Sequence, residues 1–140
     1  MKDLVIDASV AAKWLFLEKG SDQAEMLIEK INFFFAPLLF PMEMNSVITK
    51  KVRRDELNVD EANKKRVQVR KLPFKIAWDK QIDELAFELA ISLPLTYYDS
   101  TYIASAIEND AVLITADERL VNGMSNTLIN KYIKSLEEFN

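Results

Sequence analysis

Four acidic residues that are far apart in the chain each lie at or next to the end of an apolar segment: Asp7, Glu43, Asp99 and Asp117. Apolar runs such as Leu4–Ile6 and Val112–Ile114 are typical of buried parallel strands. In open α/β sheets, ligands bind in the crevice outside the carboxyl ends of the strands. We therefore expect the four carboxylates to share one pocket, and an oxygen-only set of this charge favours a hard divalent cation.

Each acidic residue taken alone has a simpler explanation. Asp7, Asp99 and Asp117 precede helical segments, where Asp is a favoured N-cap, and a Glu in a first helical turn such as Glu43 is favoured by the helix dipole. Together at one sheet edge, however, like charges would raise the pKa of at least one carboxyl and weaken the metal-free protein near neutral pH. A bound cation would remove this repulsion and supply a water of lowered pKa that can attack a phosphodiester.

Polar residues close to the acidic positions are candidates for supporting them through hydrogen bonds: Ser9, Asn45, Ser46 and Thr115. The alternative for each is an ordinary hydrogen bond at a helix start or turn. Both interpretations stay open at this stage.

The aromatic residues favour packing over recognition. Tyr97, Tyr98 and Tyr102 could stack on nucleobases, but core packing is expected for at least two of them. Trp14 and Trp78 are predicted to lie in the core.

The composition excludes several chemistries. The 140 residues include no cysteine and no histidine, so there is no disulfide framework, no zinc–thiolate site, no Ser-His-Asp triad and no imidazole base. The length fits one domain spanning residues 1–140. No apolar run is long enough to span a bilayer and the N-terminus does not resemble a signal peptide, which predicts a cytoplasmic protein.

Charge is distributed unevenly along the chain. The segment Lys50–Lys71 holds nine cations and four anions, whereas the remainder holds nine cations and eighteen anions. A basic segment on an acidic body would suit a protein that binds a polyanion with one part and cations with another. The alternative is a pair of solvated helices.

Apolar periodicity predicts alternating strands and helices. Strands are expected at 3–7, 33–36, 74–77, 112–115 and 132–134. Helices are expected at 8–17, 21–31, 41–54, 58–71 (capped by Asn58 or Asp60), 82–93, from Asp99 and from Asp117. Pro37, Pro73 and Pro94 end segments. Strands interleaved with helices imply an α/β fold with a parallel sheet.

Five segments in order resemble the PIN-domain ribonucleases, and among them the VapC-like toxins of toxin–antitoxin pairs. They are Val5–Val10, Pro41–Asn45, Lys51–Leu57, Tyr98–Tyr102 and Ile114–Leu120, so the likeness covers nearly the whole chain. One difference is that Ser46 stands three positions after Glu43, where the family often has Asn, and Asn45 is adjacent.

The resemblance implies a three-layer α/β/α fold with a central parallel sheet of four to five strands. It also implies a Mg²⁺ or Mn²⁺ site made by Asp7, Glu43, Asp99 and Asp117, endonucleolytic cleavage of RNA, a homodimer, and an antitoxin partner. We expect the first three acids to bind one metal and Asp117 to complete the pocket or help a second ion bind.

Basic side chains predicted to hold neighbouring RNA phosphates are Arg53, Arg54, Lys64 and Arg66. The main alternative is a non-catalytic module that binds RNA or protein, in which the acids are only helix caps. A phosphoacceptor module fits less well, because paired acids after the first strand and a Lys closing a late strand are missing.

Overall fold

The structure is a computed structural model that describes residues 2–139. The strands are β1 (Leu4–Ile6), β2 (Phe34–Ala36), β3 (Phe74–Ile76), β4 (Val112–Thr115) and β5 (Ile133–Ser135). The α-helices are α1 (Ala8–Leu15), α2 (Ser21–Glu29), α3 (Leu39–Arg53), α4 (Val59–Lys71), α5 (Lys80–Ser92), α6 (Tyr97–Glu108) and α7 (Glu118–Met124). Two 3₁₀ turns, η1 (Asn130–Tyr132) and η2 (Leu136–Glu138), flank β5.

The strands form one sheet in the order β3-β2-β1-β4-β5, and every neighbouring pair is parallel. The chain builds outward from β1 to β3 and then returns to place β4 on the other side of β1. The carboxyl ends of the paired strands β1 and β4 therefore mark the topological switch point, which is where ligands bind in open α/β sheets. Ile6 pairs with Ile114, so Asp7 follows its strand beside Thr115.

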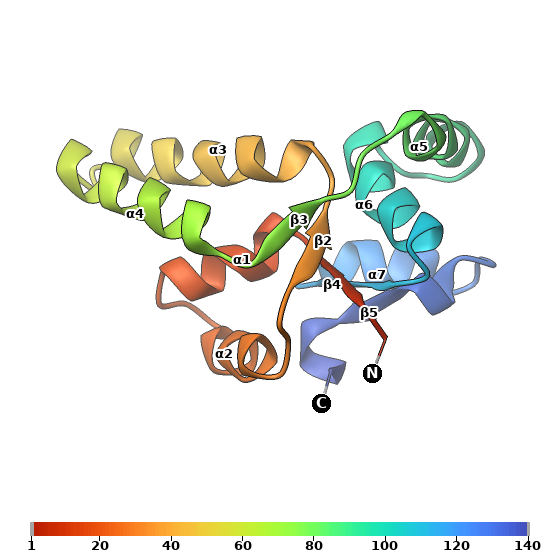
Figure 1. Cartoon of the computed structure of the whole chain (residues 1–140), viewed down its shortest axis with the longest axis horizontal. Coiled ribbons are helices and arrows are strands. Elements are labelled where there is room, and N and C mark those ends of the chain that lie inside the picture. The colour runs from red at the N-terminus through yellow and green to blue at the C-terminus, as the bar shows by residue number, and fades with distance from the viewer. Residues whose placement is uncertain (1, 140) are drawn as a thin grey trace.

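Helices cover both faces of the sheet, with α1 to α4 on one side and α5 to α7 on the other (Figure 1). This confirms the predicted three-layer α/β/α fold with a central parallel sheet. The last predicted strand is real, and it lies at Ile133–Ser135, one residue later than expected. Among residues 2–139, no helix combines the length and the apolar character that crossing a membrane requires.

The core forms where the apolar runs predicted it. All three residues of β1 are buried, as are Leu113 and Ile114 of β4. Trp14 packs against the core and donates from Nε1 to the Ala24 carbonyl at 2.6 Å, and Trp78 packs against a smaller apolar cluster beneath α5. Both tryptophans therefore lie where core packing was predicted.

Two helix starts differ from the prediction. Helix α6 begins at Tyr97, because Thr96 is its N-cap and the Thr96 hydroxyl oxygen accepts from the Asp99 amide at 3.0 Å. Asp99 therefore lies in the first turn of α6 and is not its cap. Helix α3 begins at Leu39, two residues before Pro41, which still falls in the first turn where its missing N–H has no effect on the helix.

Helices α3 and α4 pack side by side as a hairpin that extends beyond the sheet (Figure 1). Asn58 and Glu61 form a capping box that starts α4, so Asn58 and not Asp60 is the cap. The tight connection between the helices includes Asp55 with a positive φ of 60°. The hairpin contains the basic segment that the sequence singled out.

Candidate active site

The four acidic residues come together in the structure. Asp7, Glu43, Asp99 and Asp117 line one pocket of about 130 Å³, together with Ala8, Ser9, Tyr102 and Leu120. Asp7 follows β1 and Asp117 follows β4, the two strands on either side of the switch point. Glu43 comes from α3 and Asp99 from α6, so four separate segments contribute one carboxylate each.

Asp7 is the N-cap of α1, and its carboxylate lies partly buried at the end of β1. Its Oδ1 accepts from the Ser9 hydroxyl at 2.6 Å and from the Val10 amide at 3.2 Å. Burial raises the pKa of Asp7 to about 6, the charge of Glu43 acts in the same direction, and the hydrogen bond from Ser9 opposes both. Asp7 therefore caps a helix, and its ionised form is disfavoured because burial removes it from water.

Glu43 is held by a tyrosine from the opposite layer. The Tyr102 hydroxyl on α6 donates to Glu43 Oε1 at 2.5 Å. Burial and the nearby Glu43 carboxylate raise the pKa of Tyr102, so the phenol keeps the proton that it donates. Burial, followed by the charge of Asp99, raises the pKa of Glu43 despite this hydrogen bond.

The other two carboxylates are more open. Burial and the charge of Asp117 raise the pKa of Asp99, and its own amide is held by Thr96. Asp117 is the N-cap of α7, with Oδ1 accepting from the amides of Arg119 and Leu120 at 3.1 and 3.3 Å. As with Asp7, capping and participation in the pocket occur together at Asp117.

Charge repulsion runs through the pocket as a chain, because Glu43 acts on Asp7, Asp99 on Glu43, and Asp117 on Asp99. The raised pKa values agree with the expectation for the metal-free protein. For Asp7, Glu43 and Asp99, burial raises the pKa more than charge repulsion does. The expectation from the sequence considered repulsion alone.

The donor set fits a hydrated divalent cation. Carboxylate and hydroxyl oxygens are the ligands that Mg²⁺ and Mn²⁺ prefer, and a cation would offset the unfavourable ionisation of three buried or partly buried carboxyls. Within residues 2–139, no three carboxylates are placed to hold a single ion together. A divalent cation in this pocket would therefore be held partly through water, since such ions can be bound by one or two carboxylates and retain several waters.

Of the four predicted supporting residues, Ser9 lines the pocket and Thr115 forms a hydrogen bond with a residue that lines it. Ser9 bonds to Asp7, and its oxygen accepts from the Ala116 amide at 3.0 Å, which ties α1 to the end of β4. The Thr115 hydroxyl oxygen accepts from the Asp117 amide at 3.0 Å. Asn45 lies instead in a groove between α3 and α4, and Ser46 is exposed and does not line the acidic pocket.

The predicted RNA-binding cations are all exposed on the α3–α4 hairpin: Arg53, Arg54, Lys64 and Arg66. None of them forms an ion pair within 4.0 Å with an acidic group of the described chain. Two other cations of the segment face inward, since Lys51 and Lys65 lie over the Phe16 ring and Lys65 donates to the Leu15 carbonyl.

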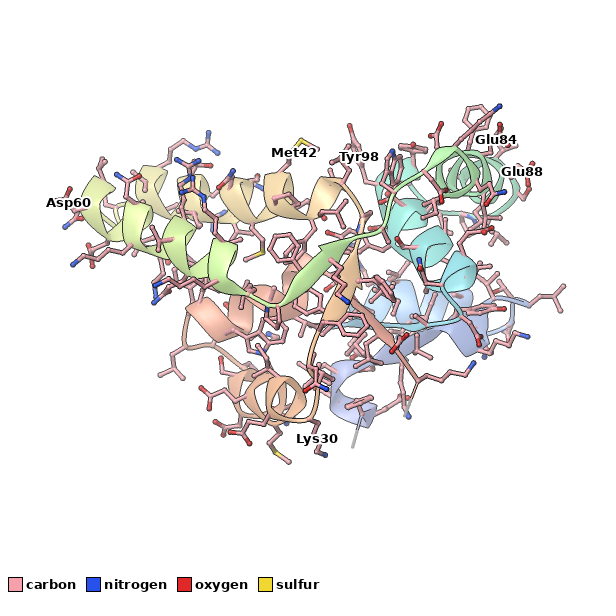
Figure 2. The ribbon with its side chains drawn as sticks, in the orientation of Figure 1. Lys30, Met42, Asp60, Glu84, Glu88 and Tyr98 are labelled. Carbon is pink, nitrogen blue, oxygen red and sulfur yellow. The ribbon has the colours of Figure 1, made fainter. Side chains whose placement is uncertain are left out.

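The sequence analysis did not predict the contact of Tyr102 with Glu43, since it expected only that at least two of Tyr97, Tyr98 and Tyr102 pack in the core. Tyr102 is indeed buried, at 4% exposed, but its hydroxyl points at a pocket carboxylate. The sequence did indicate that Tyr102 lies near the pocket, because it follows Asp99 by three residues and so lies on the same face of the helix. Tyr97 packs against the smaller apolar cluster, and Tyr98 is 62% exposed at the start of α6 (Figure 2).

Comparison with known proteins gives consistent matches. The family model described as "PIN domain" matches residues 4–122. The chain is 29% identical over 119 residues to Ribonuclease VapC3 of Pyrobaculum aerophilum, which covers 84% of this chain and 91% of that protein.

Two solved structures share the fold. The crystal structure of PAE2754 from Pyrobaculum aerophilum superposes with a TM-score of 0.72 at 21% identity, over 97% of this chain and 85% of that one. A toxin–antitoxin complex from Klebsiella pneumoniae contains a chain that matches with a TM-score of 0.67 at 16% identity, over 98% of this chain and 99% of that one.

Proposed function

Because this chain belongs to the PIN domain family, we propose that it is a divalent-metal-dependent endoribonuclease and the toxin of a toxin–antitoxin pair. The similarity to a protein named as a ribonuclease supports the activity, and the fold shared with a chain of a toxin–antitoxin complex supports the partner. The single observation that carries the proposal is the convergence of four carboxylates from four segments on one pocket at the switch point of the sheet.

The residues of the pocket have distinct roles in this proposal. Asp7, Glu43 and Asp99 would hold Mg²⁺ or Mn²⁺ directly or through water, and Asp117 would complete the pocket or help a second ion bind. When bound, the cation supplies an acidified water as nucleophile and positive charge beside the phosphate. Ser9 fixes Asp7, and Tyr102 fixes Glu43 across the two layers.

The exposed cations of the α3–α4 hairpin would hold RNA phosphates on either side of the cleaved bond. Figure 2 shows Asp60 at the far end of this hairpin, and Arg53 and Arg54 lie at the end of α3 that leads to the same tip. Charge reversal at Arg53 and Arg54 should weaken RNA binding and lower its salt dependence by about two phosphate contacts. Unchanged affinity and salt dependence would remove these residues from the RNA path.

The groove between α3 and α4 is the proposed docking place of the antitoxin. It measures about 550 Å³, and its apolar surface comes from Ile48, Val52, Val59 and Ala62. Arg53 and Arg66 also line it, so an antitoxin bound there would cover two of the cations proposed to hold RNA. An exposed apolar groove between two helices suits an amphipathic helix of a protein partner better than it suits phosphates. Val59→Asp should abolish association with a co-expressed antitoxin and leave RNA cleavage intact, whereas retained association would place the antitoxin elsewhere.

Activity is tested with a panel of structured RNAs incubated with Mg²⁺ or Mn²⁺, with EDTA, and with an Asp7→Asn variant prepared identically. Metal-dependent cleavage that the variant lacks is the expected result. The competing function is a non-catalytic module that binds RNA or protein. That function would be favoured if no RNA were cleaved and the wild-type protein also failed to bind Mg²⁺ in a calorimetric titration.

We also propose a cytoplasmic location, where the RNA substrates are, and a homodimer as the family resemblance implies. Sedimentation of the purified protein at several concentrations tests the dimer.

A further inference from the structure

A second pocket opens directly beside the acidic one. It has a volume of about 200 Å³ and lies between the start of α6 and helix α7. Asp99, Asp117 and Leu120 line both pockets, so the two share a wall. A ligand group placed in the second pocket would therefore adjoin any group held by the carboxylates.

The rest of this pocket has a different character from the acidic site. Pro94 and Leu95 give it an apolar edge above the buried Met124, and Arg119 adds a cation. Arg119 forms no ion pair within 4.0 Å with any acidic group among residues 2–139, although two carboxylates line the same pocket. A free guanidinium here disfavours a second metal ion and favours a ligand that carries both an apolar face and a negative charge.

A glycine, Gly123, also lines this pocket. A Cβ added at Gly123 would meet nothing within 4 Å, so the residue is not required by a close contact of the fold. Gly in a helix is less favourable than Ala by roughly 0.5–1 kcal/mol. A larger side chain at this position would be accommodated by the helix and would occupy the pocket.

We propose that this pocket binds the RNA nucleotide next to the cleaved phosphodiester, with its base against Pro94 and Leu95 and its phosphate on Arg119. The inference rests on the proposed nuclease function and extends it to a binding subsite. The volume is below the 300–1,000 Å³ of sites for drug-sized ligands, which suits one base. Apolar and guanidinium surfaces contact the faces of bases, so this subsite would accept several bases.

The test separates binding from cleavage. Binding of a short fluorescent single-stranded RNA is measured by anisotropy in EDTA at several salt concentrations, and cleavage of the same RNA is measured with Mn²⁺. The variants are Arg119→Gln and Gly123→Leu. Their matched controls are Lys30→Gln, at the end of α2 on the opposite side of the molecule from Tyr98 (Figure 2), and Gly123→Ala.

Arg119→Gln should weaken metal-free RNA binding about tenfold and reduce the salt dependence by about one phosphate contact. Gly123→Leu should weaken binding by a similar factor, and Gly123→Ala and Lys30→Gln should bind as the wild type does. The stabilisation of each variant by Mg²⁺ in a thermal melt should stay at the wild-type value, because the carboxylates are untouched.

Two results would overturn the subsite. One is wild-type RNA binding by Gly123→Leu in a folded protein, and the other is equal binding by Arg119→Gln and Lys30→Gln. If the wild-type protein binds RNA through this pocket but cleaves none, the nuclease function fails and the subsite stands. If the wild-type protein cleaves RNA and all variants bind RNA as it does, the subsite is refuted and the nuclease function stands.

Discussion

Replacing Asp7 by Asn should stabilise the metal-free protein near neutral pH. The Asp7 carboxyl is partly buried at the end of β1, and its pKa is raised from 3.8 to about 6 by burial, with a further contribution from Glu43. An acid whose pKa is raised on folding contributes stability that is fully present below pH 3.8 and is lost as the pH rises through about 6. Asn has the same shape, remains neutral and caps a helix as well as Asp does.

The size of the effect follows from the pKa. Raising it from 3.8 to about 6 makes ionisation in the folded protein less favourable by about 3 kcal/mol. Asp7→Asn should therefore gain up to about 3 kcal/mol at pH 7.5, equivalent to roughly 5–10 °C in melting temperature for a chain of this length. At pH 4 the gain should shrink to about 0.5 kcal/mol, because Asp7 is then mostly protonated in the folded wild-type protein.

The assay is urea unfolding in EDTA at pH 4 and pH 7.5. The matched control is Asp79→Asn, because Asp79 is the N-cap of α5 and accepts from the Ile82 amide at 2.8 Å but lies outside the acidic pocket. The control should change the free energy of unfolding by less than about 0.5 kcal/mol at either pH. If Asp7→Asn is no more stable than the control at pH 7.5, burial does not disfavour the Asp7 carboxylate and the electrostatic account of the pocket is wrong.

Three further predictions concern the same pocket. Tyr102→Phe removes the donor to Glu43 and should lower cleavage about tenfold in a folded protein, whereas Tyr98→Phe at the exposed neighbour should not; equal activities in the cleavage assay would deny Tyr102 a positioning role. Ser9→Ala removes the hydrogen bond that lowers the pKa of Asp7, so the Asp7 pKa should rise above about 6 and the loss of stability with rising pH should continue to a higher pH. An unchanged pH profile of urea unfolding would contradict this. Asp99→Asn should raise the metal-free melting temperature, because the raised pKa of Asp99 penalises its charged form, and should reduce the stabilisation by Mg²⁺; full Mg²⁺ stabilisation in a thermal melt would exclude Asp99 as a ligand.

Most of the secondary structure could be predicted from local patterns. Apolar runs marked β1 and β4, and prolines marked the ends of β2, α4 and α5 within two residues. Asn58, one of the two expected caps, marked the start of α4. The start of α6 was the exception: Thr96 three residues before Asp99 forms a competing cap, and the expectation for Asp99 overlooked it.

The candidate site was predicted only in part. The placement of Asp7 and Asp117 follows from the sequence, since residues after parallel strands meet at one edge of a sheet. The separation of Asn45 from the pocket could have been predicted, because residues two positions apart on a helix do not face the same side and Glu43 faces the pocket. The assignment of the four acids as metal ligands stays a prediction.

The sequence by itself determined the chemistry that is open to this protein, because the absence of histidine and cysteine leaves carboxylate oxygens as the main ligands and bases. Only the tertiary structure decided which residues cooperate. The return of the chain puts β4 beside β1, the packing of α6 brings Tyr102 to Glu43 from 59 residues away, and α7 sets Arg119 next to the carboxylates. These contacts depend on strand order and helix packing, which are properties of the whole fold and are not encoded in any local segment.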